Sequence, residues 1–152
     1  MKRTDKRLRL CTALLVMLLV FIWGNSLMPG QVSQAISDWV KNLLFGPPAS
    51  VRAQETGSGI IRKMAHFTEF AALGADLSWL FGMLQKKKHW PLLFGILAGC
   101  VDETIQAFVP ERAPGLRDVL IDSCGVLAGM TFLYLGHSYL KKRSTNQSLE
   151  DK

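Results

Sequence analysis

Among the side chains with acid, base or metal-binding chemistry that lie inside otherwise apolar stretches of this chain, five form the candidate set: His66, Glu69, Asp102, Glu103 and Asp122. An imidazole beside carboxylates can move protons or hold a metal ion that activates water, so all five are candidate catalytic residues. His66 and Glu69 stand three residues apart, which places them on one face of a helix. They resemble one arm of a metal site, which Asp102, Glu103 or Asp122 would complete with carboxylate oxygens.

Four hydrophobic stretches carry these side chains, and we predict that each is a transmembrane helix. Of their 81 residues, 55 are hydrophobic, against 19 of the other 71, and each stretch approaches the roughly 20 residues that cross a bilayer. Such segregation excludes a disordered chain, a collagen-like repeat and a disulfide-stapled miniprotein. The stretches are residues 10–28, 64–84, 90–109 and 119–139. The expected fold is therefore all-α, with a transmembrane domain over residues 8–139 and basic cytoplasmic tails at 1–7 and 140–152.

The placement of basic residues predicts the orientation of these helices. With a cytoplasmic N-terminus, twelve of the eighteen Lys and Arg residues fall inside, in residues 1–9, in the link 85–89 and after residue 139. Cytoplasmic loops of membrane proteins are enriched in Lys and Arg in this way, whereas a soluble four-helix bundle, the alternative fold, has no reason to alternate its basic links. We therefore expect a multi-pass protein with both termini in the cytoplasm, whose charge of +6 attracts anionic lipids rather than nucleic acid.

The first stretch and the first loop admit alternatives. A basic start followed by an apolar run also suits a signal peptide, but no small-x-small cleavage site follows, so we interpret it as an uncleaved signal anchor. Between residues 29 and 63, apolar side chains at helical spacing around Trp39 predict a short amphipathic helix. This helix would either lie on the outer membrane surface or cap the bundle through its apolar stripe. After two prolines, residues 50–59 are expected to form a mobile loop.

The polar groups of three helices are predicted to reach one level of the membrane. With a rise of about 1.5 Å per residue, His66, Asp102, Glu103 and Asp122 lie roughly 9 to 11 Å below the outer boundary, and Glu69 slightly deeper. Ionisable groups are costly in hydrocarbon, so these faces should turn inward and either pair or line a wet cavity. Above them, the loop 110–117 adds two guanidinium groups suited to carboxylate or phosphate. The candidate ligand-binding residues are Lys63, His66, Glu69, Glu103, Gln106, Arg112, Arg117 and Asp118.

Three interpretations of this polar layer remain open. It can be an internal network, including Arg62, that fixes the register of the helices. It can bind a polar head group, an antibiotic or a wall precursor, with Arg112 and Arg117 on the anion. It can also be a hydrolytic site, which uses either a metal ion or Ser26 as a nucleophile with His66 as its base. Transport is a weaker alternative, because four helices without an internal repeat leave little room for alternating access.

The glycines and cysteines of these helices are expected to serve packing. Gly125 and Gly129 have the G-x-x-x-G spacing that lets two helices approach closely. None of the cysteines, Cys11, Cys100 and Cys124, has a C-x-x-C neighbour, which argues against a disulfide framework and against a structural zinc site.

Three separated motifs resemble the VanZ-like family of small bacterial membrane proteins. They read K-x-A-H-F-x-E-F-x-x-L-G at 63–74, D-E-x-x-Q-x-F-x-P-x-R at 102–112 and D-x-x-x-D-x-x-G-x-x-x-G at 118–129, and the resemblance covers residues 8–138. The resemblance implies a protein of the bacterial cell membrane with a role in the cell envelope, specifically in resistance to teicoplanin, a lipoglycopeptide antibiotic. The alternative is a membrane-embedded hydrolase of a lipid-linked or cell-wall substrate. Asp76 is not a residue that the family pattern leads us to expect.

Overall fold

The computed structural model describes residues 2–47 and 51–150, and five α-helices contain most of them. The helices are α1 (Lys2–Ser26), α2 (Gly30–Phe45), α3 (Val51–Met83), α4 (Trp90–Ala107) and α5 (Leu116–Glu150). Each of the four predicted apolar stretches coincides with one of α1, α3, α4 and α5, and the predicted amphipathic segment is α2. The prediction of an all-α fold is therefore confirmed.

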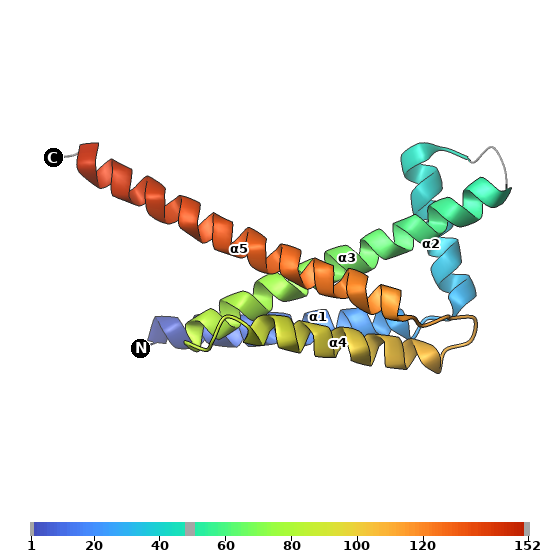
Figure 1. The fold of residues 1–152 in the computed structure, drawn as a ribbon, viewed down its shortest axis with the longest axis horizontal. Helices are drawn as coiled ribbons and strands as arrows, with labels where there is room; N and C mark the ends of the chain where they lie inside the picture. Colours follow the sequence, from blue (N-terminus) through green and yellow to red (C-terminus); the bar gives the residue numbers. More distant parts are fainter. Residues whose placement is uncertain (1, 48–50, 151–152) are drawn as a thin grey trace.

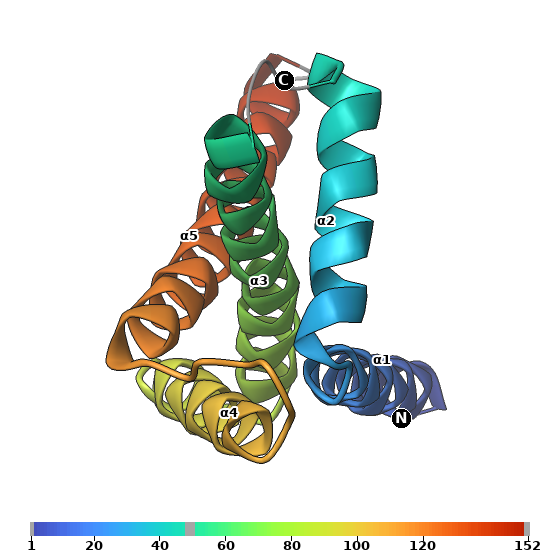
Figure 2. The same cartoon turned by 90° about the vertical axis from the view of Figure 1, so that its right-hand side faces the viewer.

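Helix α3 organises the bundle, because it contacts each of the other four helices. Figure 1 shows α3 and α5 crossing near their middles, with α1 and α4 running alongside. Turned by 90°, α3 lies in the centre, with α2 beside its first half (Figure 2). The side chains of α3 are thus the ones that can meet residues from every other helix.

The crossing of α3 and α5 depends on glycines that let the two backbones approach. A Cβ atom on Gly129 would overlap the carbonyl oxygen of Ala71, and one on Gly74 would overlap the backbone of Val126. Gly125 is equally confined, since its Cβ would meet the carbonyl oxygen of Phe67. The prediction that Gly125 and Gly129 permit close packing is confirmed. This contact fixes the depth at which residues of α3 face residues of α5.

The bundle buries polar side chains and exposes apolar ones. Among the described residues, a small cluster of buried apolar side chains forms the core: Ile22, Phe70, Leu73, Leu77, Ala98 and Val126. Large hydrophobic side chains cover the outward faces of the helices, among them Val16, Val20, Phe21, Leu93, Phe94, Leu97, Phe132 and Leu135. Two described segments are long and apolar enough to cross a membrane, Thr4–Ser26 and Leu116–Arg143. A soluble bundle would bury its apolar side chains and expose its polar ones, so these apolar outward faces suit a membrane protein.

Residues 51–59 do not form the predicted loop. The predicted mobile loop is wrong from Val51 onward, because these residues form the first turns of α3, while Ser50 lies outside the described residues. Arg, Ala, Gln and Glu favour helices, and adding turns to a helix that already runs to Met83 avoids a new nucleation step. The two glycines at 57 and 59 do not outweigh these terms.

Helix α2 resolves one alternative that the sequence left open. Its buried side chains are Ser37 and Lys41, whereas Trp39, Leu43 and Phe45 are exposed. The polar side of α2 therefore faces α3, and the apolar stripe points away from the bundle. A cap formed through the apolar stripe is thus wrong, and the exposed stripe is what a helix lying on a membrane surface requires.

Candidate functional site

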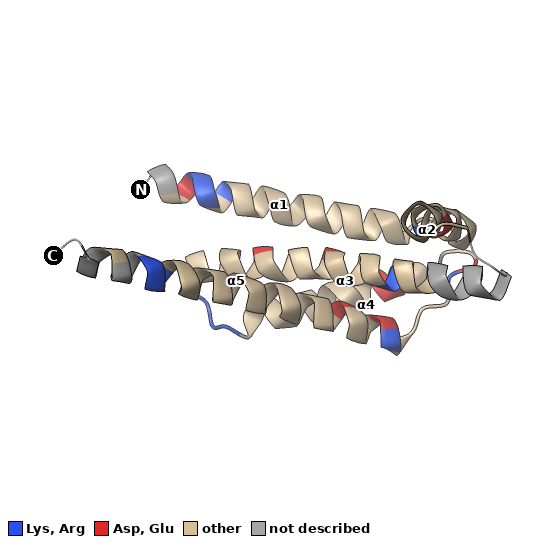
Figure 3. Cartoon of the chain, turned by 90° about the horizontal axis from the view of Figure 1, so that it is seen from above, with Lys and Arg blue, Asp and Glu red and all other residues tan. Residues whose placement is uncertain are grey.

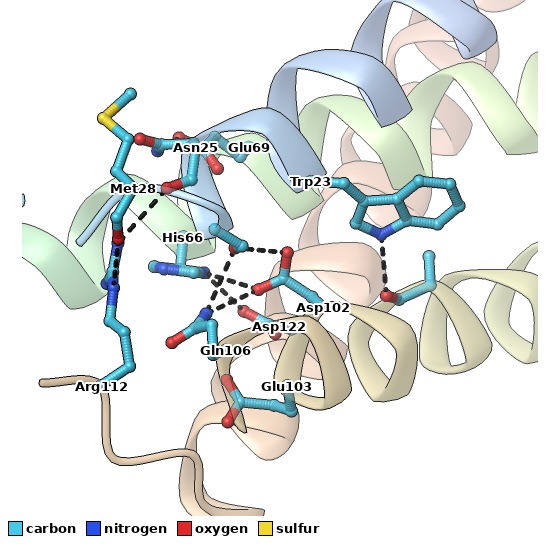
Figure 4. A network of polar contacts seen from close by, with 12 residues as sticks. Trp23, Asn25, Met28, His66, Glu69, Asp102, Glu103, Gln106, Arg112 and Asp122 are labelled. Atoms are coloured by element: carbon cyan, nitrogen blue, oxygen red, sulfur yellow. Dashed lines mark hydrogen bonds and ion pairs between the residues drawn. The ribbon is translucent and has the colours of Figure 1, made fainter. Parts of the chain in front are cut away.

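Asp102 is the centre of a buried polar network formed by α1, α3, α4 and α5 (Figure 4). Its side chain is fully buried, and each carboxylate oxygen accepts one hydrogen bond. Ser26 Oγ, at the end of α1, donates to Oδ1 at 2.6 Å, and Gln106 Nε2, one turn later on α4, donates to Oδ2 at 2.8 Å. Gln106 also donates to Ser26 Oγ at 3.3 Å. These bonds hold the Asp102 carboxylate in one orientation.

His66 brings α3 into this network between two carboxylates. Its Nδ1 atom lies 3.7 Å from Asp102 Oδ2 and 3.6 Å from Asp122 Oδ1. One ligand atom from each of the three residues lies within 4.8 Å of the other two. The prediction that three helices bring polar side chains together is confirmed for these residues, while their depth in a membrane stays a prediction.

Several atoms of the network have no hydrogen-bond partner among the described residues. They are His66 Nδ1, both carboxylate oxygens of Asp122, and one oxygen each of Glu69 and Glu103. Asp122 is only 1% exposed, so water does not satisfy it at the surface. A buried polar atom left unpaired costs about 1 to 3 kcal/mol, and more when it is charged. Such a cluster is atypical of a purely structural core and typical of a site that receives another group.

Glu69 and Glu103 lie near the network but bond elsewhere. Asn25 Nδ2 donates to Glu69 Oε1 at 3.0 Å, and the backbone N–H of Gly115 donates to Glu103 Oε2 at 2.8 Å. The five residues proposed from sequence as candidate metal ligands are therefore brought together only in part. His66 and Asp102 meet, with Asp122 as the third ligand-bearing residue.

Hydrogen bonds and close backbone contacts hold the loop between α4 and α5 against the turn between α1 and α2. Gly30 N donates to the carbonyl oxygen of Pro110 at 3.1 Å, and a Cβ at Gly30 would overlap the backbone of Glu111. Glu111 has a left-handed backbone with φ 61°, and its side chain accepts a hydrogen bond from Gln31 Nε2 at 2.7 Å. These contacts set the position of the next residue, Arg112.

Arg112 caps the end of α1 at the edge of the site. Its Nε and a terminal nitrogen donate to the carbonyl oxygens of Met28 and Asn25, at 3.1 and 3.3 Å. Burial lowers the pKa of Arg112 and the nearby Arg62 lowers it further, so an anion beside this guanidinium would favour its charged form. The other arginine proposed from sequence, Arg117, is exposed.

A cavity of about 130 Å³ adjoins the network. Six of the eight predicted ligand-binding residues line it, namely Lys63, His66, Glu103, Gln106, Arg112 and Asp118. Glu69 and Arg117 do not line it, while Arg62 and Asp122 do. This volume accommodates several water molecules or a small charged group. Acidic and imidazole groups line the cavity together with cations, so it can take up a ligand of mixed charge.

The end of α1 contributes more than the sequence analysis anticipated. Asn25 was not a candidate, although it holds Glu69, and Ser26 bonds to Asp102 rather than to His66. The Ser26 hydroxyl is therefore not paired with His66 as a nucleophile with its base would be. The sequence feature that could have identified these two residues is their position as an Asn-Ser pair in the last turn of an otherwise apolar helix, where polar side chains need partners inside the bundle.

Comparison with known proteins gives one match. A family model described as VanZ/LLP1 matches residues 11–137, a range that includes all the residues of the network. No curated protein and no solved structure matches the chain.

Proposed function

Because the chain belongs to the VanZ/LLP1 family, we propose that it is an integral membrane protein of the bacterial cell envelope that contributes to resistance against teicoplanin-type lipoglycopeptides. The observation that carries this proposal is the mixed-charge cavity, with Lys63 and Arg112 lining it beside His66 and Asp122. The cavity would bind the charged part of the antibiotic or of a cell-wall precursor at the outer membrane face. Cations there would hold carboxylate or phosphate, and the acidic groups would accept amines.

The proposed topology has four spans, formed by α1, α3, α4 and α5. In support, the basic start of α1, the link between α3 and α4 and the basic stretch of α5 lie at the same end of the bundle (Figure 3). Helix α2 is at the other end (Figure 1), and the polar network lies there too, because Ser26, which donates to Asp102, is the last residue of α1. Cytoplasmic ends are the basic ones, so the cavity would face outward.

Reporter fusions test this topology. A fusion at Glu55 should report an external position and a fusion at Lys87 a cytoplasmic one. An internal signal at Glu55 would contradict the proposed orientation and would place the cavity on the cytoplasmic side.

A second candidate function is hydrolysis of a lipid-linked or cell-wall substrate in the same cavity. The position of His66 between Asp102 and Asp122 favours it, since a carboxylate orients an imidazole and stabilises its protonated form. Comparing envelope lipids and wall precursors with and without the protein would separate this activity from binding, because only hydrolysis changes their chemical composition.

Susceptibility to teicoplanin, normalised to membrane abundance, tests the proposed binding role. Lys63 is exposed and lines the cavity, so Lys63→Gln removes a charge from it without disturbing the core. We expect this variant to lose protection at normal abundance. Lys6→Gln is the matched control, because Lys6 is also exposed but lies near the start of α1, whereas the polar network lies at the end of that helix. Equal protection by both variants would overturn the role of the cavity.

A further inference from the structure

We propose that His66, Asp102 and Asp122 bind one divalent transition-metal ion, with a free coordination position that faces the cavity. The inference deepens the proposed function, on which it rests for the outward orientation of the site and for the kind of ligand that reaches the ion. Metal binding itself depends only on the three side chains and on what surrounds them.

The spacing of the three side chains fits a metal ion. Imidazole nitrogen and carboxylate oxygen bind Zn²⁺ at about 2.0 to 2.2 Å, which separates neighbouring ligand atoms of a tetrahedral site by about 3.4 Å. His66 Nδ1 lies 3.7 Å from Asp102 Oδ2 and 3.6 Å from Asp122 Oδ1. These separations exceed the usual hydrogen-bond length, and a shift of a few tenths of an ångström would bring His66 Nδ1 to the spacing of neighbouring ligand atoms with each carboxylate. The ligand atoms of the two carboxylates lie within 4.8 Å of each other, so Asp102 and Asp122 would close on the ion as it binds.

The pattern of hydrogen bonding is the second observation. Asp122 is 1% exposed, and neither of its oxygens accepts a hydrogen bond from the residues that the structure describes. Nδ1 of His66, which faces both carboxylates, also has none. His66 Nδ1 and Asp122 Oδ1 lie 3.6 Å apart beside Asp102 Oδ2, and one cation between these three atoms would interact with all of them. Water could bridge the same atoms, but it would leave the charges uncompensated.

Charge balance also favours a divalent cation. Among the residues that the structure describes, no Lys or Arg lies within 4.0 Å of the carboxylate of Asp102 or of Asp122. Arg112, which lines the cavity together with Asp122, donates to backbone carbonyls at the end of α1. Burying two carboxylates without compensating charge costs several kcal/mol. A divalent ion neutralises both, whereas a protonated His66 supplies one positive charge.

The surroundings of Asp102 resemble the outer shell of a metal site. Ser26 and Gln106 each donate to one of its oxygens, which fixes the carboxylate and leaves lone pairs free for a metal. Among the described residues, the ligand atoms that converge within 4.8 Å belong to His66, Asp102 and Asp122, whereas Glu69 and Glu103 are held by Asn25 and by the backbone of Gly115. One nitrogen and two carboxylates favour Zn²⁺ or Mn²⁺ over Ca²⁺ and Mg²⁺, which prefer oxygen alone.

The fourth position would face the cavity, because His66 and Asp122 both line it. Lys63 and Arg112 line the same cavity, so a phosphate or carboxylate group could reach the ion while these cations hold its other oxygens. The site would thus select anionic groups of envelope ligands.

Metal content of the purified protein tests the inference. The full chain is purified in detergent without chelator, its affinity tag is removed, and its metals are measured by elemental analysis. We expect about one Zn or Mn ion per chain. Asp122→Asn should lower this content at least about tenfold. Asp76→Asn is the matched control, because Asp76 is also a buried carboxylate on the bundle interior but lies away from the cavity, and it should keep the metal.

A second measurement covers the case in which Asp122→Asn fails to fold. Wild-type protein is stripped with chelator and titrated with Co²⁺, whose visible absorption reports nitrogen and oxygen coordination. Saturation near one equivalent, with Zn²⁺ displacing Co²⁺, would support the site. Wild-type protein that neither retains metal nor binds Co²⁺ would overturn it, as would unchanged metal content in a folded Asp122→Asn variant. Neither result depends on teicoplanin susceptibility, so the proposed function would stand or fall separately.

Discussion

The bundle contains two buried layers that differ in how well their atoms are satisfied. The apolar layer consists of Ile22, Phe70, Leu73, Leu77, Ala98 and Val126, and lies where the glycines bring α3 and α5 together. The polar layer, one to two turns closer to α2, consists of Ser26, His66, Asp102, Gln106 and Asp122. In the apolar layer, side chains and backbone pack directly against one another. The second leaves several atoms without partners and adjoins a cavity.

Asp76 shows why unpaired atoms alone do not identify a functional site. It is buried on the inward side of α3, and no hydrogen bond to either of its oxygens falls within the usual distance limits among the described residues. However, no second carboxylate or histidine joins it in a ligand-bearing cluster among the described residues, and it does not line the cavity beside His66. The polar layer differs from the surroundings of Asp76 because three helices bring His66, Asp102 and Asp122 together next to a cavity.

The largest effect on folding is expected from Gly129→Ala in the apolar layer. Its new Cβ would overlap the carbonyl oxygen of Ala71, so α3 and α5 would have to separate, at a cost of about 1 to 3 kcal/mol or more. The unfolding temperature of the protein in detergent and its abundance in the membrane should both fall. Gly82→Ala is the control, since nothing lies within 4 Å of its Cβ. Equal stability of the two variants would contradict the close crossing.

Ser26→Ala should have the next largest effect, because it removes a buried donor from Asp102. A hydrogen bond to a charged group contributes about 1.5 to 3 kcal/mol, and the bond lost here is 2.6 Å long. We expect lower thermal stability together with weaker protection against teicoplanin. Thr12→Ala, an exposed hydroxyl on the same helix that bonds only to the carbonyl oxygen of Leu8, should change neither. A Ser26→Ala variant as stable as Thr12→Ala would remove Ser26 from the network.

Arg112→Lys should cost less, because a lysine keeps the charge but cannot donate to two carbonyl oxygens in the same fork. The half-buried guanidinium holds Met28 and Asn25, and losing one such bond costs about 0.5 to 1.5 kcal/mol. A small decrease in the unfolding temperature is expected, with a larger decrease for Arg112→Gln. If Arg112→Gln were as stable as the wild type, the cap at the end of α1 would have no energetic role.

Asp76→Asn should have the smallest effect of the four. The substitution removes a buried charge that has no basic partner, so the lower desolvation cost offsets any packing change, and we expect a difference below about 1 kcal/mol. Protection against teicoplanin should remain. A large loss of stability would show that Asp76 has a partner that matters, and a loss of protection alone would extend the functional site into the apolar layer.

The sequence predicted the helices and the level of the polar groups well, because both follow from periodicity. Apolar runs located α1, α3, α4 and α5, and the rise per residue placed His66, Asp102 and Asp122 at one depth. Which oxygen meets which donor depends instead on how the helices rotate and cross. The sequence therefore favoured Glu69 and Glu103 as metal ligands, although they bond to Asn25 and Gly115.

Helix α2 illustrates a second limit of sequence analysis. Its amphipathic pattern was recognised, but periodicity does not say which side meets the protein. The buried Ser37 and Lys41 give the answer only once α3 is in place.

A paired comparison of Asp122→Asn with Asp76→Asn tests the central claim, that the polar layer is a functional site rather than a structural network. Both substitutions exchange a buried carboxylate that accepts no hydrogen bond from the described residues for an amide of the same size, one beside the cavity and one away from it. Teicoplanin susceptibility is measured in cells whose membranes contain equal amounts of each variant. We predict that Asp122→Asn cells become as susceptible as cells without the protein, while Asp76→Asn cells stay protected. Equal protection by the two variants would contradict the claim.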